Sequence, residues 1–199
     1  MRFWAVAIAF LVTLFAGSIQ AQRGALVKQR NLSELTERAE RIVHAHVVSA
    51  KVEPHPQYPS LSTVVVTLHV DDTLKGAAAQ QLTFRQFIWD WRDKQDAAGY
   101  RKGREVILFL NKVNENGLTS PSGMDQGRLD VYHTPDGRAV IKPKAASRTF
   151  LAGVDTSLAK QGKTMPPSMR SAMIDPSRPI ELSEMKSVVR ELAGTRSTQ

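Results

Sequence analysis

A helical pattern of apolar residues begins at residue 32. Apolar side chains recur every three or four positions along one stripe, at Leu32, Leu35, Ala39 and Ile42, which is the spacing of one buried face of a helix. Asn31 stands directly before this stripe, and Glu34 follows Asn31 by three residues. These are the two positions of a capping box, which satisfies free backbone N–H groups. The sequence therefore predicts a short helix that begins after Asn31.

After this helix the pattern changes to a period of two, which is the spacing of a β-strand. In residues 42–52 an apolar face alternates with a face that carries His44 and His46. The run 105–110 is apolar after its first residue, so we expect it to be the central strand, buried on both faces. Further strand patterns occupy residues 62–71, 81–88, 127–133 and 138–142. The sequence therefore predicts five or six strands between residues 41 and 143, as in a small barrel or sandwich.

Turn signals and a change of composition mark the remaining segments. Asn116-Gly117 and Pro135-Asp136-Gly137 are typical of tight turns. Residues 89–102 are polar with interspersed aromatic side chains and predict a long loop or partial helix. Residues 145–179 hold several prolines among Ser, Lys and Arg, which predicts an extended or flexible connector. A last helix is expected from an apolar stripe that ends before Gly194 and comprises Leu182, Met185, Val188, Val189 and Leu192.

Residues 1–21 have the pattern of a secretory signal peptide. Arg2 precedes an apolar run over residues 3–16, and small residues follow up to an expected cleavage point after Ala21. A helix of that length spans about 21 Å, less than the roughly 30 Å of a hydrocarbon core, so an uncleaved membrane anchor is the less favoured alternative. We therefore expect export to the periplasm or the medium. The mature chain is expected to have a flexible N-terminus over residues 22–30 and not to span the membrane.

Composition and charge narrow the function classes. Hydrophobic residues make up 42% and charged residues 23% of the chain, which excludes a wholly disordered protein. Cysteine is absent, so disulfides, thiolate metal sites and cysteine nucleophiles are excluded. The net charge of +8 comes mainly from residues 138–199, which hold 11 basic and 5 acidic residues, whereas residues 22–137 hold 15 and 14. We therefore expect no nucleic acid partner, but contact between the basic tail and an anionic surface.

Several segments carry a resemblance to a known family. They are residues 39–49, 64–76 and 103–110, together with the strand at 127–132 and the Pro-Asp-Gly hairpin. These segments resemble bacterial exported proteins of unassigned function whose barrel is similar to the tissue-inhibitor-of-metalloproteinase (netrin-like) module. The resemblance extends over roughly residues 33–143.

The resemblance implies a mainly β fold with a five-stranded OB-like barrel. The barrel domain is expected over residues 31–144 with an N-terminal helix, and residues 145–199 are expected to form the basic connector and C-terminal helix. The resemblance does not imply inhibition of a metalloproteinase, because the inhibitors of that family act through an N-terminal cysteine and this chain has no cysteine. Fold similarity by itself assigns no function.

Three histidines form a candidate metal site. His44 and His46 project from one strand face, and His69 belongs to the next predicted strand. Three imidazoles around an open position suit zinc and activate a bound water. The alternative is that these histidines lie on a solvated strand face without a metal, because no carboxylate accompanies them at motif spacing.

Aromatic and basic residues are interleaved in the segment 85–104. Such a combination can stack on a ligand and contact anionic or polar groups. The alternative is that one tryptophan closes the open end of the barrel as part of the core. The candidate residues for binding a ligand or partner are Trp89, Trp91, Arg92, Tyr100 and Arg101.

No catalytic residues are assigned from the sequence. A Gly-x-Ser-x-Gly elbow and a phosphate-binding glycine loop are missing, and no cofactor is expected. We expect an exported, non-catalytic binding or interaction module whose partner is an envelope protein or a glycan. Two alternatives stay open: a metal-assisted or other hydrolytic enzyme of the cell envelope, and a structural subunit of an envelope complex that docks through its last helix.

Overall fold

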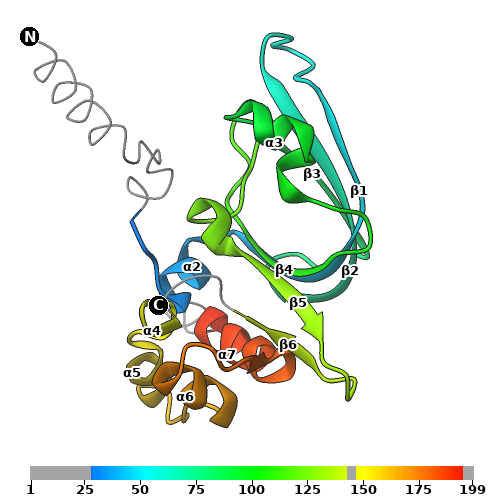
Figure 1. Cartoon of the computed structure of the whole chain (residues 1–199). Coiled ribbons are helices and arrows are strands. Elements are labelled where there is room, and N and C mark those ends of the chain that lie inside the picture. The colour runs from blue at the N-terminus through cyan, green and yellow to red at the C-terminus, as the bar shows by residue number, and fades with distance from the viewer. Residues whose placement is uncertain (1–27, 143–146, 195–199) are drawn as a thin grey trace, which may run out of the picture.

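A seven-stranded antiparallel sheet forms the centre of the protein (Figure 1). The computed structural model describes residues 28–142 and 147–194, with only the backbone of residues 147 and 148. The predicted signal peptide and residues 22–27 lie outside the described residues. The strand order is β3-β2-β1-β4-β5-β6-β7. The strands are β1 (Arg41–Pro54), β2 (Ser62–Lys75), β3 (Gln81–Phe87), β4 (Glu105–Leu110), β5 (Arg128–His133), β6 (Ala139–Ile141) and β7 (Ile180–Glu181).

The prediction of a mainly β fold is confirmed, but the prediction of a closed five-stranded barrel is wrong. The sheet is open, since β3 and β7 stand at the two ends of the strand order. The segment that follows β4 makes only isolated bridges, from Leu118 to Arg85 of β3 and from Pro121 to Leu110 of β4. A proline has no N–H to donate to a ladder, so this segment lies along the sheet without becoming a closing strand.

The predicted N-terminal helix and its cap are confirmed. Helix α2 spans Leu32–Arg38, directly after Asn31. The backbone N–H of Glu34 donates to Asn31 Oδ1 at 2.8 Å, and the N–H of Asn31 donates to Glu34 Oε2 at 3.2 Å. Both hydrogen bonds of the capping box are therefore present. The polar segment after β3 forms the short helix α3 (Trp91–Gln95) and the 3-10 turn η1 (Ala97–Gly99), as a partial helix was expected there.

The prediction of an extended connector over residues 145–179 is wrong. Most of its described part folds into α4 (Ser147–Leu151), α5 (Val154–Ala159) and α6 (Pro167–Ile174). Pro167 starts α6 rather than breaking it, because the first helical position needs no N–H. The apolar residues between the prolines are spaced for short helices and are buried, namely Phe150, Leu151, Val154, Leu158, Met165, Met169 and Ala172.

The last helix, α7 (Leu182–Gly194), follows the prediction. Its apolar stripe is buried at Leu182, Met185, Val188 and Val189, and Leu192 packs beside it. Helices α2 and α4 to α7 gather at one end of the molecule, while α3 lies at the other end (Figure 1). None of the helices within residues 28–142 and 147–194 has the length and apolarity needed to cross a bilayer.

The two faces of the sheet support two separate hydrophobic cores. Val106, Leu108 and Leu110 of β4 belong to the sheet core, which is made largely by β1, β2, β3 and β4. Ile107 and Phe109 of the same strand belong to the helix-side core, where the helices pack on the sheet. The central strand is therefore buried on both faces, as its continuous apolar run predicted.

Candidate functional site

Four neighbouring strands bring six ionisable side chains together on the face of the sheet that carries the helix-side core. We call this group the histidine–carboxylate cluster. Strands β1, β2, β4 and β5 supply it. Its members are His44, His46, His69, Asp71, Glu105 and His133.

Glu105 lies between two imidazoles of this cluster. His44 Nε2 is 2.7 Å from Glu105 Oε1, and His133 Nε2 is 2.7 Å from Glu105 Oε2. Burial raises the pKa of Glu105, but the hydrogen bonds from His133 and His44 outweigh this effect and hold that pKa below its ordinary value. Glu105 is therefore ionised, and because a carboxylate only accepts hydrogen bonds, both imidazoles donate from Nε2.

His46 stands between the two carboxylates of the cluster. Its Nδ1 is 2.7 Å from Asp71 Oδ2, and its Nε2 is 3.6 Å from Glu105 Oε2. Each ring nitrogen of His46 therefore faces a carboxylate. His69 is more remote, with its Nε2 3.9 Å from Asp71 Oδ1.

His44 differs from His46 because its second nitrogen has no acceptor. The Nδ1 atom of His44 is buried, and no hydrogen-bond partner for it exists in the described part of the chain. The hydrogen bond from Nε2 to Glu105 therefore fixes the orientation of the His44 ring.

The three imidazoles predicted as a zinc site do not converge. The rings of His44 and His46 are 6.4 Å apart, and each is hydrogen-bonded to a different carboxylate, while His69 reaches only Asp71. Across the described ranges, no group of three or more His, Asp or Glu side chains is placed so as to hold a metal ion. The sequence-based hypothesis missed Glu105 and His133, because the register of β1 against β4 and β5 cannot be read from sequence spacing.

A charged contact ties α7 to the sheet beside this cluster. Asp72 is the register partner of His44, and its carboxylate pairs with Lys186 and with Arg190, whose Nη2 is 2.5 Å from Oδ2. Burial raises the pKa of Asp72, but the hydrogen bonds and charges of Lys186 and Arg190 outweigh the effect of burial. The pKa of Asp72 therefore lies below its ordinary value. The contact helps to fix the helix against β2.

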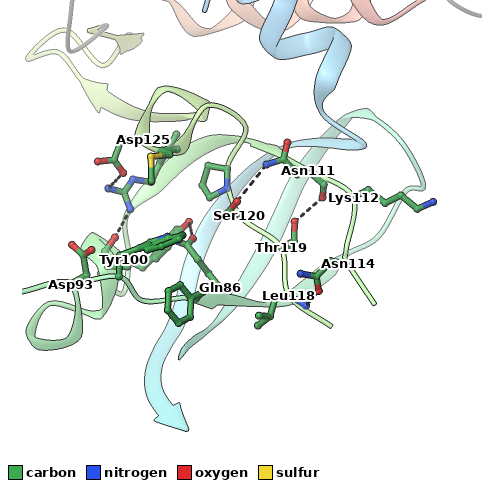
Figure 2. Close-up of a pocket in the computed structure, with 16 residues that line it drawn as sticks. Gln86, Asp93, Tyr100, Asn111, Lys112, Asn114, Leu118, Thr119, Ser120 and Asp125 are labelled. Atoms are coloured by element: carbon green, nitrogen blue, oxygen red, sulfur yellow. Dashed lines mark hydrogen bonds and ion pairs between the residues drawn. The ribbon is translucent and has the colours of Figure 1, made fainter. Parts of the chain in front are cut away.

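A pocket of about 670 Å³ opens at the end of the sheet where α3 lies. We call it the end pocket. It lies between residues 86–100 on one side and residues 111–128 on the other (Figure 2). Its volume falls in the range of small-ligand sites, about 300–1,000 Å³.

Buried polar contacts hold the first wall of the end pocket. The Tyr100 hydroxyl donates to Gln86 Oε1 at 3.0 Å, and burial raises the pKa of Tyr100. The hydroxyl therefore stays protonated. The guanidinium of Arg128 lies 4.9 Å from the Tyr100 ring centroid and donates from Nη1 to the Ala98 carbonyl at 2.6 Å. Arg128 thus joins the two walls, and Asp125 lies 3.4 Å from its Nη2.

Hydrogen bonds within the second wall of the end pocket, and one bond to β3, hold this wall in place. The N–H of Thr119 donates to the carbonyl of Arg85 at 2.9 Å, and the Thr119 hydroxyl donates to the carbonyl of Asn111 at 2.7 Å. The N–H of Asn114 donates to the carbonyl of Leu118 at 2.8 Å, and that of Asn111 to Ser120 at 3.1 Å. The wall is therefore preformed.

The backbone beside the end pocket is strained. In the described residues, the non-glycine residues with positive φ are Ala97 at 51°, Ala98 at 55° and Met124 at 59°. Ala98 and Met124 line the pocket, and Ala97 is next to Ala98. Left-handed conformations cost non-glycine residues about 1–3 kcal/mol each and cluster at functional sites. This strain marks both walls of the pocket as candidate binding elements.

The structure brings together some of the aromatic and basic residues predicted for binding. Trp89 lines the end pocket and is 78% exposed, with the Phe87 ring edge-on at 4.9 Å between centroids. Tyr100 also lines the pocket but is buried. Trp89 and Trp91 are both exposed, so the alternative that one of them belongs to the core is wrong.

The remaining residues of that prediction lie elsewhere. Trp91, Arg92 and Arg101 are not among the residues that line the end pocket. Trp91 is 64% exposed, and the Arg92 guanidinium lies 5.7 Å from its ring. Sequence reasoning also missed Asn111, Asn114, Met124 and Arg128, which carry no motif and reach the pocket only through the loop after β4 and the start of β5.

Comparison with known proteins finds no family model, no curated protein and no solved structure that matches this chain. The resemblance to the netrin-like module therefore stays a prediction from the sequence pattern. The functional argument rests on the geometry of the end pocket.

Proposed function

We propose that the chain is an exported, non-catalytic binding module that receives its ligand in the end pocket. The observation that carries the proposal is a preformed pocket with strained backbone on both walls and a tryptophan at its rim that is 78% exposed. Binding residues are commonly presented on loops that a rigid scaffold positions. Here β3 and β4 are the scaffold, and the segments after them form the walls.

Two ionisable groups of the end pocket, Tyr100 and Arg128, favour binding over catalysis. The Tyr100 hydroxyl is kept protonated by burial, and it is engaged with Gln86. The Arg128 guanidinium is held by Ala98 and Asp125. Groups with such fixed partners serve to shape a pocket, whereas proton transfer needs a group that is poised to gain or lose a proton.

Two expectations from the sequence receive less support: docking of a structural subunit through its last helix, and contact of the basic tail with an anionic surface. The apolar stripe of α7, through which a structural subunit would dock, is buried within this chain. Several cations of the basic tail already pair with acidic groups: Arg138 with Glu181, Lys163 with Glu191, and Lys186 and Arg190 with Asp72. Their pairing weakens the case for a tail that binds an anionic surface.

A single-tryptophan variant tests the proposal. The chain contains three tryptophans, so replacing Trp4 and Trp91 by Phe leaves Trp89 as the reporter. Ligands in the end pocket are expected to change the emission of Trp89 and to shift its maximum to the blue. The panel should contain neutral glycans, anionic glycans and peptide libraries. A Trp89 signal that stays unchanged across all three classes would contradict the proposal.

A further inference from the structure

We propose that the end pocket binds a neutral glycan, with one sugar ring stacked on Trp89. This inference rests on the proposed function, because it assigns a ligand class to the same pocket. It is carried by three observations: an exposed aromatic ring at the rim, a second wall in which three backbone N–H groups are already paired, and a balanced set of charges.

Trp89 supplies the stacking surface. Its side chain is held edge-to-face against Phe87 at 4.9 Å between centroids, yet 78% of its surface remains exposed. The contact with Phe87 limits the freedom of the indole, which lowers the entropy lost when a ligand covers it. The C–H face of a pyranose ring is apolar and flat, so it is complementary to an exposed indole.

The pairing of the backbone argues against an extended peptide. Recognition of a peptide as an added strand needs unpaired N–H and C=O groups along an edge. In the second wall, the N–H groups of Asn111, Asn114 and Thr119 already donate to Ser120, Leu118 and Arg85. These three N–H groups are not free to pair with an added strand, which favours recognition by the side chains of the pocket.

Two of these side chains are amides held in a fixed orientation. Gln86 accepts from Tyr100 through Oε1, and Asn114 accepts through Oδ1 from the N–H groups of Asn116 and Leu118. These hydrogen bonds involve the oxygen atom of each amide. They therefore orient the NH₂ group without involving it as a donor. Asp125 adds a carboxylate whose oxygens each accept more than one hydrogen bond. Fixed donors and acceptors within one pocket match the closely spaced hydroxyls of a sugar.

The charges of the end pocket favour a neutral ligand. Lys112 and Arg128 are balanced by Asp93 and Asp125 among the lining residues. Arg128 is also engaged by the Ala98 carbonyl and by Asp125. A sulfated or uronic-acid chain would meet two carboxylates and gain little from a guanidinium that is already paired.

Calorimetry on the full chain with defined hexasaccharides tests this inference. The neutral probes are cellohexaose, maltohexaose, mannohexaose and chitohexaose, and the anionic probe is a heparin hexasaccharide. The variants are Trp89→Leu, which removes the ring, Trp89→Phe, which keeps one, and the matched control Trp91→Leu, outside the pocket. Trp89 is exposed, so the melting temperature is expected to stay unchanged in these variants.

We expect at least one neutral hexasaccharide to bind the native chain and Trp91→Leu equally. Trp89→Leu should weaken this binding about tenfold, and Trp89→Phe should restore most of it, because stacking needs a ring and not only apolar volume. Absence of binding by every neutral hexasaccharide, equal binding by Trp89→Leu, or tighter binding of the heparin probe would overturn the inference. If the Trp89 reporter then responds to peptides, the proposed function stands and only the ligand class is wrong.

Discussion

Glu105 accepts a hydrogen bond from His44 at 2.7 Å, although the two residues are 61 positions apart in the sequence. The contact exists because β1 and β4 are antiparallel neighbours, with His46 opposite Glu105 and His44 opposite Ile107. His44 thereby gains an acceptor for its Nε2 proton beside the helix-side core, and Glu105 gains one of the two donors that keep it ionised.

Glu105→Gln is expected to reduce the acid sensitivity of folding. The pKa of Glu105 in the folded chain lies below its ordinary value of 4.5, so its stabilising contribution is present above that value. The contribution is lost as the pH falls through the lower folded-state pKa. Urea denaturation from pH 6 to pH 3 should therefore show a smaller loss in the free energy of unfolding for Glu105→Gln than for the native chain.

The same substitution should lower the free energy of unfolding by about 1–3 kcal/mol at pH 7, because an amide offers only one oxygen to the two imidazoles. Glu115→Gln is the matched control, since Glu115 is exposed, and its denaturation curve should follow that of the native chain. If the free energy of unfolding of Glu105→Gln changed with pH in parallel with that of the native chain, the cluster would not contribute to the acid sensitivity of folding.

Lys75→Met is expected to loosen the end of α2. Lys75 Nζ donates to the carbonyls of Thr36, Glu37 and Ala39, at 2.8, 3.1 and 2.5 Å. These carbonyls belong to the last turn and the cap of α2, where no intrahelical donor remains. Loss of the ammonium should lower the free energy of unfolding by about 1.5–3 kcal/mol. Lys51→Met, at an exposed position of β1, should leave the urea midpoint unchanged.

Gly127→Ala is expected to distort the second wall of the end pocket. A Cβ atom at this position would lie 2.4 Å from the carbonyl oxygen and 2.8 Å from the nitrogen of Ser122, both backbone atoms. Relief of the clash requires a backbone shift, with a cost of about 1–3 kcal/mol. Gly194→Ala meets nothing within 4 Å and serves as the control. Thermal melts should show a lowered midpoint for Gly127→Ala alone.

Met169→Ala tests whether the segment before α7 belongs to the folded core. Met169 is 0% exposed in α6, whereas Ile174 of the same helix is 79% exposed. Met169→Ala should lower the free energy of unfolding by about 2–5 kcal/mol. The free energy of unfolding of Ile174→Ala should stay within about 0.5 kcal/mol of that of the native chain. Equal urea midpoints for the two variants would show that the helices contribute little to stability.

Local patterns in the sequence predicted most of the sheet. The apolar run of β4, the alternation in β1 and the capping box at Asn31 each depend on near neighbours, and each is confirmed. The prolines and basic residues of 145–179 are typical of a connector, and the helical spacing of its apolar residues is weak, so the sequence pattern predicts the wrong structure there. The helices there are short and are stabilised by packing against α7 and the sheet.

The prediction of a closed barrel is wrong for a different reason. A closed barrel and an open curved sheet share the same alternation of residues, since both have an inner and an outer face. Whether β3 meets a closing strand depends on the segment that contains Pro121, which makes isolated bridges only. A strand pattern does not contain that information.

The candidate site was predicted in part, for a physical reason. Trp89 stood out because aromatic residues interleaved with charged residues are visible in the sequence, whereas its exposure is known only from the structure. Glu105 and His133 did not stand out, because their meeting depends on strand register, and Asn114 reaches the pocket through a turn. Side chains that act through long-range placement give no signal in a single sequence.

The bridge between Leu118 and Arg85 also affects the tendency of this protein to aggregate at high concentration. An open sheet offers its outermost strands as templates on which further chains can stack into aggregates. At one margin, β3 is shielded where residues 118–119 run along it, and at the other margin β7 is only two residues long before the chain turns into α7. Both edges of the sheet are therefore protected against pairing with strands of other chains.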